Sequence, residues 1–381
     1  MYDTVGIMKQ FIFDRLVDRE NLCNLKKEKD QLLHYIENKD NVVVYAPRNF
    51  GKTSLLKNVV IEDFIKQHKK SFVFFADLMG VKSLNSIIGR LMNSFERSFN
   101  ESFPVRNIFE NIKTFLFMLK PEVSIDSITG NPSISLGISA DKKEYSIFYI
   151  FQLLSGISKK IPVLIVIDEF QDIVSVDEAE TLFRSVFQEM DNMPVILMGS
   201  KRHLLSDIFS LPSAPLYSWG VDIEIPPIPY NEYHVYMNER FSTKNIHIAY
   251  DEAVYLQNLL NRIPEPVNIV CQQIMDTYDN LEITKDMINN SLKQILNNRE
   301  RRYETQIQGF SGSEEKILSE LAKMETIEKP QSKTFIAKTG RTSRTIGKVF
   351  EKLMQTGIIE KTGTYYRISD PLFRFYLNYY R

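Results

Sequence analysis

The chain has 381 residues, of which 43% are hydrophobic and 25% charged, and its formal net charge is −1. This length predicts two or three domains rather than one core. The sequence contains no run of eighteen apolar residues and no signal-peptide layout over Met1 to Gln10, which excludes a membrane-spanning helix and predicts a cytoplasmic protein with no membrane partner.

The two cysteines and the distribution of charge restrict the kinds of site that we expect in this chain. Cys23 and Cys271 lie far apart beside apolar residues, which favours reduced, packed thiols over a disulfide or a metal site. Residues 313–381 hold thirteen Lys and Arg against eight Asp and Glu, a net +5 that leaves −6 for the rest. The basic C-terminal region therefore needs its own explanation.

Short apolar runs alternate with amphipathic stretches in the first half of the chain, which is typical of an α/β fold with a parallel sheet. One helical pattern begins at Gly51, and another covers Ala179 to Met190. Buried strands are predicted at Val42 to Tyr45, Phe72 to Ala76, Pro162 to Ile167 and Pro194 to Met198. We therefore predict an α/β core over residues 1–229.

One segment interrupts this alternation of predicted strands and helices. Apolar residues alternate with polar ones from Glu122 to Ser139, on both sides of Thr129-Gly130-Asn131-Pro132. This pattern predicts a β-hairpin inserted into the core.

The strands stop after Pro226-Pro227-Ile228-Pro229, and Asn231 to Gln306 is predicted to be helical throughout. Expected N-caps are Asn231, Asp251 and Thr284. This gives a helical domain over residues 230–306, followed by a linker from Gln306 to Ser313 and a third domain over residues 313–381.

A phosphate-binding loop is predicted at Ala46-Pro47-Arg48-Asn49-Phe50-Gly51-Lys52-Thr53, between the first strand and a helix. In the pattern G-x-x-x-x-G-K-[ST], backbone N–H groups surround the β-phosphate at the helix N-terminus, the lysine reaches the β- and γ-phosphates, and the hydroxyl binds Mg²⁺. Ala46 replaces the first glycine. The residues expected to bind ATP here are Pro47, Arg48, Asn49, Phe50, Gly51, Lys52, Thr53 and Ser54.

Two carboxylates follow the apolar strand that ends at Ile167. Asp168 fits the acid that holds the Mg²⁺ shell in P-loop NTPases, together with Thr53. Glu169 would orient and deprotonate the attacking water. A solvated loop after a buried strand is the alternative that these two residues alone would leave open.

A polar residue also follows the next predicted strand. Ser200 is placed to lie beside the γ-phosphate, and Arg202 is a candidate contact to the γ-phosphate or to a neighbouring subunit. The alternative is that Lys201, Arg202 and His203 form an ordinary charged helix start. The five histidines lack metal-ligand spacing, and Trp219 is expected to pack rather than to bind adenine.

The basic C-terminal region has a winged-helix pattern. Helices are expected at Ser313 to Lys323, Ser332 to Ala337 and Ser343 to Gln355, followed by two short strands about Thr362-Gly363. The third helix would act as a recognition helix on double-stranded DNA. Candidate DNA contacts are Ser343, Arg344, Lys348, Lys352 and Lys361. The alternative is a module that binds a protein partner.

With these motifs in place, the chain resembles the archaeal-type ATPase family, in the AAA+ and STAND branch of P-loop NTPases. The resemblance rests on Phe13 to Leu22, Ala46 to Leu55, Leu164 to Asp172, Gly199 to Leu204, and Tyr366 to Phe375. It implies an AAA+-like core, a helical lid and a C-terminal winged helix.

The resemblance also bears on single residues. It implies that Val17 and Arg19 lie near the adenine. Family members usually carry a glycine pair and a proline in the lid, where this chain has Asn261 to Pro266. This departure argues against a lid-borne sensor at that place, for which Arg262 is the candidate. Trp219 stands near the position where many relatives carry an arginine.

Three functions follow from these observations. The first is a Mg²⁺-dependent ATP hydrolase that couples its nucleotide state to a DNA or protein partner. The second is a nucleotide-gated signalling switch with slow hydrolysis and a protein partner. The third is a transcription regulator whose core serves only for dimerisation. The sequence leaves the oligomeric state open.

Overall fold

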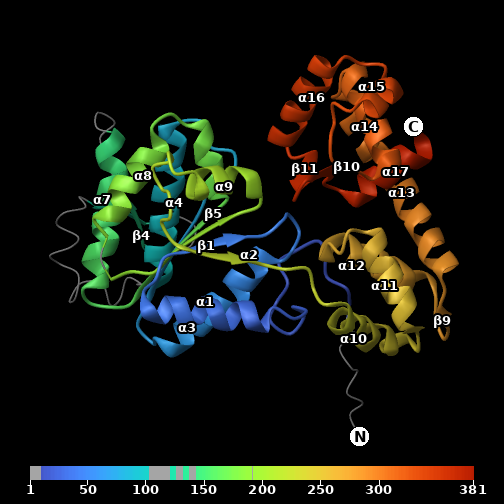
Figure 1. Cartoon of the computed structure of the whole chain (residues 1–381). Helices are drawn as coiled ribbons and strands as arrows, with labels where there is room; N and C mark the ends of the chain where they lie inside the picture. Colours follow the sequence, from blue (N-terminus) through green and yellow to red (C-terminus); the bar gives the residue numbers. More distant parts are fainter. Residues whose placement is uncertain (1–9, 103–120, 126–131, 137–142, 191) are drawn as a thin grey trace, which may run out of the picture. The chain divides into compact units, whose positions relative to one another are not determined.

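The computed structural model describes residues 10–102, 121–125, 132–136, 143–190 and 192–381 (Figure 1). The described chain divides into two compact units. We call Asp18–Pro226 the sheet unit, and Met1–Val17 with Pro227–Arg381 the helical unit. Within the described ranges, no helix is both long and apolar enough to cross a membrane.

A five-stranded parallel sheet forms the centre of the sheet unit. All four predicted strands are confirmed, within one residue at each end. A further edge strand was missed because only Ile223 of its four residues is buried, so no apolar run marks it. The strands are β1 Val42–Tyr45, β2 Phe72–Asp77, β5 Val163–Asp168, β6 Val195–Gly199 and β7 Val221–Glu224.

The strand order is β2-β5-β6-β1-β7, so β6 lies between β1 and β5. Tyr45 on β1 pairs with Gly199 on β6, and Ile167 on β5 pairs with Leu197. The carboxyl ends of these three strands therefore meet at one edge of the sheet. Asp168 is the last residue of β5, and the phosphate-loop segment and Ser200 follow the ends of β1 and β6.

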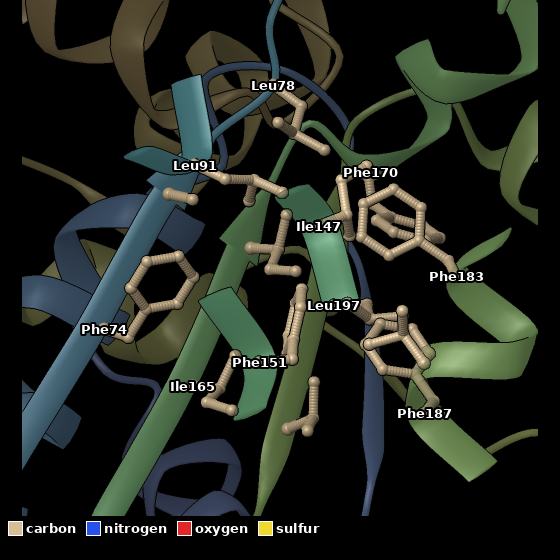
Figure 2. Close-up of a cluster of buried hydrophobic side chains, with 14 of the residues drawn as sticks. Phe74, Leu78, Leu91, Ile147, Phe151, Ile165, Phe170, Phe183, Phe187 and Leu197 are labelled. Atoms are coloured by element: carbon tan, nitrogen blue, oxygen red, sulfur yellow. The ribbon is translucent and has the colours of Figure 1, made fainter. Parts of the chain in front are cut away.

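One face of the sheet packs against α4 Leu84–Ser102, α7 Lys143–Ser158, α8 Ala179–Gln188 and α9 Arg202–Ser210. Figure 2 shows Phe74, Ile165 and Leu197, from neighbouring strands, directed toward aromatic side chains of these helices. Phe183 makes edge contacts with Phe151 and Phe170. The predicted helix from Ala179 is confirmed as α8, which ends two residues earlier than expected.

The other face is covered by α1 Lys26–Asn38 and by a helical stretch that begins at Lys52 (Figure 1). That stretch consists of α2 Lys52–Leu55, the π-helix η1 Leu56–Val60 and α3 Ile61–Gln67. Lys57 of η1 lies 4.2 Å from the ring centroid of Phe75, which anchors the stretch on β2. The sequence pattern predicted this helix but not its π-helical turn.

The inserted hairpin is confirmed as an antiparallel pair. Its strands are β3 Pro121–Ile125 and β4 Pro132–Leu136. Pro132, which was assigned to the turn, instead opens β4 and pairs with Ile125. The rest of the predicted turn, and the predicted end of the hairpin at residues 137–139, lie outside the described residues.

The helical unit contains α10 Tyr230–Phe241, α11 Tyr250–Leu259, α12 Pro264–Thr277 and α13 Lys285–Gln308. The prediction of helix throughout this region was wrong, because β8 His247–Ile248 and β9 Glu282–Ile283 form a short parallel pair. These strands are two residues each, too short to give an alternating pattern.

Of the three predicted N-caps in this region, only Thr284 is confirmed, since its side chain accepts a hydrogen bond from the Met287 N–H. The caps proposed at Asn231 and Asp251 were wrong, because Pro229 and Ala249 occupy those positions. Asp251 lies instead in the first turn of its helix, where a carboxylate interacts favourably with the helix dipole.

The start of the described chain packs in the helical unit. The Phe11 N–H donates to Gln272, and Asn268 donates to the Ile12 carbonyl at 2.8 Å. Arg240, only 2% exposed, donates to the Gln10 carbonyl. This N-terminal segment is therefore fixed on α10 and α12.

The C-terminal part of the helical unit has the winged-helix arrangement that the sequence predicted. The antiparallel sheet has the order β10-β12-β11. Its elements are α14 Gly312–Met324, β10 Thr326–Ile327, α15 Lys333–Thr339, α16 Ser343–Gln355, β11 Ile359–Thr362, β12 Tyr365–Ile368 and α17 Pro371–Tyr380. The predicted linker is shorter than expected, because α13 runs to Gln308 and Ser311 already caps α14.

Candidate nucleotide site

The loop after β1 has the backbone geometry of an anion-binding turn. Gly51 adopts φ +83° and Asn49 φ 66°, both in the left-handed region. The helical stretch starts at Lys52 with no side chain capping it, so its first N–H groups face the loop. Ala46 is 3% exposed and its N–H donates to the Gly199 carbonyl at 3.3 Å. Alanine at this position is therefore accommodated as part of the sheet edge.

The other loop residues differ in exposure. Phe50 and Ser54 are buried, whereas Arg48 and Asn49 are exposed and Pro47 is half-buried. The exposed pair lies at the loop surface, while Phe50 anchors the loop in the core.

Lys52 joins this loop to the carboxylates that follow β5. Its side chain is 9% exposed, and its Nζ lies 2.7 Å from Glu169 Oε1 and 3.5 Å from Asp168 Oδ1. Residues 117 positions apart in sequence thus form one buried ion pair. A buried ammonium needs such partners, since an isolated charge away from water is costly.

Thr53 and Asp168 face each other directly. The Thr53 hydroxyl donates to Asp168 Oδ2 at 3.0 Å. Burial raises the pKa of Asp168, although the Lys52 ammonium and the Thr53 hydroxyl oppose the rise. A hydroxyl and a carboxylate supply the oxygen donors that Mg²⁺ prefers, and a bound cation would favour the ionised form of Asp168. These two residues therefore fit a Mg²⁺ site.

Glu169 is held by three donors. Lys52, Gln171 and Ser200 donate to its carboxylate at 2.7, 2.5 and 2.9 Å. Burial pushes the pKa of Glu169 upward, but the Lys52 charge and these hydrogen bonds outweigh it, so its pKa lies below the ordinary glutamate value. Its backbone is left-handed, with φ 52°. Glu169 is therefore ionised near neutral pH, as a base must be.

Ser200 reaches the same cluster from the end of β6. Its hydroxyl contacts Glu169 Oε2, so the structure brings together Lys52, Thr53, Asp168, Glu169 and Ser200. Arg202 is the first residue of α9, and its side chain lies outside the described residues.

Arg19 lies in the sheet unit, in contact with α3. Its guanidinium donates to Asp63 at 2.6 and 3.2 Å and to the Val59 carbonyl of the π-helix at 3.0 Å. The hydrogen bonds that Arg19 donates to Asp63 raise the pKa of Arg19. Val17 closes the N-terminal segment of the helical unit. Their expected position near the adenine stays a prediction.

Arg262 and Trp219 also have defined contacts. Arg262 donates to the Ile228 carbonyl at 2.6 Å and lies over the Tyr230 ring at 4.1 Å. Trp219 packs on Phe187 at 4.8 Å between ring centroids, which confirms its packing role. Among the described residues, no group of three or more His, Cys, Asp and Glu side chains could hold a metal ion.

The proposed DNA-contacting face lies on α16 and the wing. Ser343, Arg344 and Lys348 are exposed, and the buried side of α16 carries Ile346, Val349, Phe350 and Leu353. Lys352 is 60% exposed and forms an ion pair with Glu314 of α14 at 2.6 Å. Lys361 is exposed on the wing, 5.5 Å from the Tyr366 ring centroid.

Sequence reasoning assigned no role to two residues beside the cluster, Gln171 and Asp172. Gln171 binds Glu169, while Asp172 accepts from the Gly80 N–H at 2.7 Å and pairs with Lys201 at 3.4 Å. Their position just after the two carboxylates was a usable signal, but only the fold brings Gly80 and Lys201 to them.

Two parts of the sequence match known family models. Residues 17–197 match a family model described as an ATPase domain predominantly from Archaea, and residues 301–379 match a probable winged helix domain. No curated protein matches the sequence.

Solved structures share the fold over nearly the whole chain. The Walker-type ATPase of Pyrococcus abyssi has 18% identity and a TM-score of 0.63, covering 96% of this chain and 99% of that one. The ORC2 protein of Aeropyrum pernix, in ADPNP-ADP complexes, has 13% identity and a TM-score of 0.53, covering 96% of each chain. The ORC1 protein of the same organism, in complex with DNA, has 11% identity and a TM-score of 0.52, covering 96% and 94%.

Proposed function

Because the chain carries an ATPase domain of a family found predominantly in Archaea, followed by a winged-helix domain, we propose that it is a Mg²⁺-dependent ATP hydrolase. The observation that carries this proposal is the single bonded cluster of Lys52, Thr53, Asp168, Glu169 and Ser200. Three strand ends contribute to it, as P-loop chemistry requires.

Each residue has a distinct role in this proposal. Lys52 attracts the β- and γ-phosphates, and Thr53 and Asp168 hold Mg²⁺. Bound Mg²⁺ supplies charge neutralisation for the departing phosphate. Phosphate oxygens compete with Glu169 for the Lys52 ammonium, which frees Oε1 of Glu169 to accept a proton from water.

The substitution Glu169→Gln tests this assignment. It keeps the shape of the side chain but removes the base, so turnover should fall about 100-fold to 10,000-fold. Binding of a fluorescent ATP analogue should change less than threefold. Glu101→Gln on α4 is exposed and makes the same chemical change away from the cluster, so it should behave as wild type. Wild-type turnover in Glu169→Gln would remove the base assignment.

We further propose that the hydrolase couples its nucleotide state to double-stranded DNA through α16 and the wing. Support comes from the exposure of Arg344, Lys348 and Lys361 on one module. The ORC1 protein in complex with DNA has a related fold. Binding to labelled duplex across a salt series, with and without ATP, tests this proposal, because phosphate contacts give a steep salt slope. Absence of binding at low salt would exclude DNA.

A second function, a nucleotide-gated switch with a protein partner, is favoured by one observation. Glu169 is bound by three donors, including Lys52, so the base is restrained until the phosphates compete for that lysine. Such a switch would hydrolyse slowly and retain its nucleotide. Turnover that is unchanged by duplex DNA, together with nucleotide that remains bound through gel filtration, would favour it over the first proposal.

A further inference from the structure

Gln171 is a buried polar side chain that the roles described above leave unused. It lies on the 3₁₀-helix Phe170–Ser175, directly after the two carboxylates, and is 0% exposed. Its Nε2 donates to Glu169 Oε2 at 2.5 Å and to Asp172 Oδ1 at 3.2 Å. Its Oε1 has no hydrogen-bond partner among the described residues.

Burying an amide oxygen without a partner is costly, so this orientation must be favoured by other contacts. Turning the amide over would place Oε1 against two carboxylate oxygens, where it has nothing to donate. The two acceptors, Glu169 and Asp172, therefore fix which end of the amide faces them.

The backbone of β6 holds the other end of the amide. A Cβ on Gly199 would lie 2.0 Å from Gln171 Oε1 and 2.6 Å from Leu205 Cδ1. No side chain larger than hydrogen fits there unless the amide and the Leu205 side chain both move. Gly199 thus provides space for the Gln171 amide at the end of β6, which Ser200 directly follows.

Asp172, the second acceptor, is itself restrained. Its Oδ2 accepts from the Gly80 N–H at 2.7 Å, and its Oδ1 lies 3.4 Å from Lys201 Nζ. Gly80 is in the turn after β2, and Lys201 immediately precedes α9. The amide therefore links Glu169 to a carboxylate held by two further elements of the sheet unit.

We propose that Gln171 is a positioning residue for hydrolysis, which holds the Glu169 carboxylate in a fixed orientation when Lys52 is drawn to phosphate. This inference rests on the proposed role of Glu169 as the base. Gln171 and Ser200 share Oε2, so Oε1, the oxygen that Lys52 contacts, is the one left to accept the proton.

The test is Gln171→Met in the full chain, which keeps the length of the side chain but removes the donor. We expect kcat to fall about tenfold while KM for ATP changes less than twofold. Gln188→Met, the same change at an exposed position on α8, should match wild type. An unchanged kcat, or a KM that changes along with kcat, would overturn the proposal.

A second variant reaches the amide without removing any of its hydrogen-bonding groups. Gly199→Ala forces Gln171 away from β6 and should lower kcat with little change in KM. If Gln171→Met does not fold, the decision passes to Asp172→Asn, for which an unchanged kcat overturns the proposal. Turnover retained in Glu169→Gln would remove the base and this inference together. Turnover lost there, with wild-type kcat in Gln171→Met, removes only the role of Gln171.

Discussion

The two candidate sites hold their charges in opposite ways. In the sheet unit, Lys52 is 9% exposed and contacts carboxylates 116 and 117 positions away, at Asp168 and Glu169. In the winged helix, Arg344 and Lys348 are exposed on one helix, and Lys352 is 60% exposed beside a single carboxylate. The first site depends on the fold to bring its parts together, whereas the second depends only on the surface of α16 and the wing.

This difference predicts how each site responds to substitution. A desolvated cluster loses much of its function when one member is removed, because the remaining charges become unpaired. A solvated basic face loses little for each charge, because phosphate contacts contribute small and nearly additive amounts. Single substitutions therefore separate the two kinds of site.

The largest expected change in binding belongs to Lys52→Ala. The loss of its charged contacts to phosphate should weaken nucleotide binding by about 2–3 kcal/mol, or roughly 100-fold. Titration with a fluorescent nucleotide measures it. Lys57→Ala, on the same helical stretch but over the Phe75 ring, should leave nucleotide affinity unchanged. Equal affinities in wild type and Lys52→Ala would contradict the phosphate assignment and favour a core used only for dimerisation.

Thr53→Val should have the next largest effect. The isosteric valine lacks the hydroxyl that contacts Asp168, so the Mg²⁺ concentration that gives half-maximal nucleotide affinity should rise about tenfold. Thr53→Ser keeps the hydroxyl and should stay within twofold of wild type. The measurement is nucleotide binding across a Mg²⁺ series, which does not require turnover. The same Mg²⁺ dependence in both variants would exclude Thr53 from the metal site.

Much of the sheet unit could be predicted because its strands are buried on both faces. Val42 to Tyr45 is an uninterrupted apolar run in the sequence and a fully buried strand in the fold. The polar residues at the ends of such strands were found for the same reason. The edge strand at Val221–Glu224 was not, because three of its four residues are exposed.

The parts of the site that could not be predicted depend on long-range packing. Nothing in the sequence around Gly199 indicates that it makes room for Gln171. Its backbone is not in the left-handed region, and the contact is seen only in the distance between a Cβ at this position and Gln171 Oε1. The engagement of Arg19 with Asp63 also joins segments that no periodicity relates. Local sequence patterns predicted the polar residues of the site. The contacts that surround those residues depend on the tertiary fold.

The third expected effect is at Glu314 of α14, which forms an ion pair with Lys352 of α16. Hydrogen bonds from Lys352 and from the Ser311 backbone hold the pKa of Glu314 below its ordinary value. A lowered pKa stabilises the fold above the unfolded-state pKa, near 4.3, and this contribution is lost as pH falls through the lower folded-state value. Glu314→Gln should remove about 1 kcal/mol at pH 7 and flatten that acid dependence.

Urea unfolding between pH 3 and pH 7 (approximately the range over which glutamate titrates) measures this effect. Far-UV circular dichroism follows both units, while fluorescence of Trp219, the single tryptophan, follows the sheet unit. The Trp219 transition should be unchanged in Glu314→Gln. A variant that keeps the wild-type acid dependence would show that the Glu314 contacts contribute nothing to stability.

The smallest effect is expected for Lys348→Ala, and it tests the exposed face most directly. If Lys348 contacts one phosphate, its loss should weaken duplex binding only a few-fold at moderate salt and reduce the salt slope by about one. Lys323→Ala is the matched control, because this exposed lysine on α14 is already paired with Glu320 at 3.2 Å. Its loss should leave the slope unchanged. Equal changes in both variants would mean that DNA responds to the overall charge of the module, and the assignment of α16 as the recognition helix would then fail.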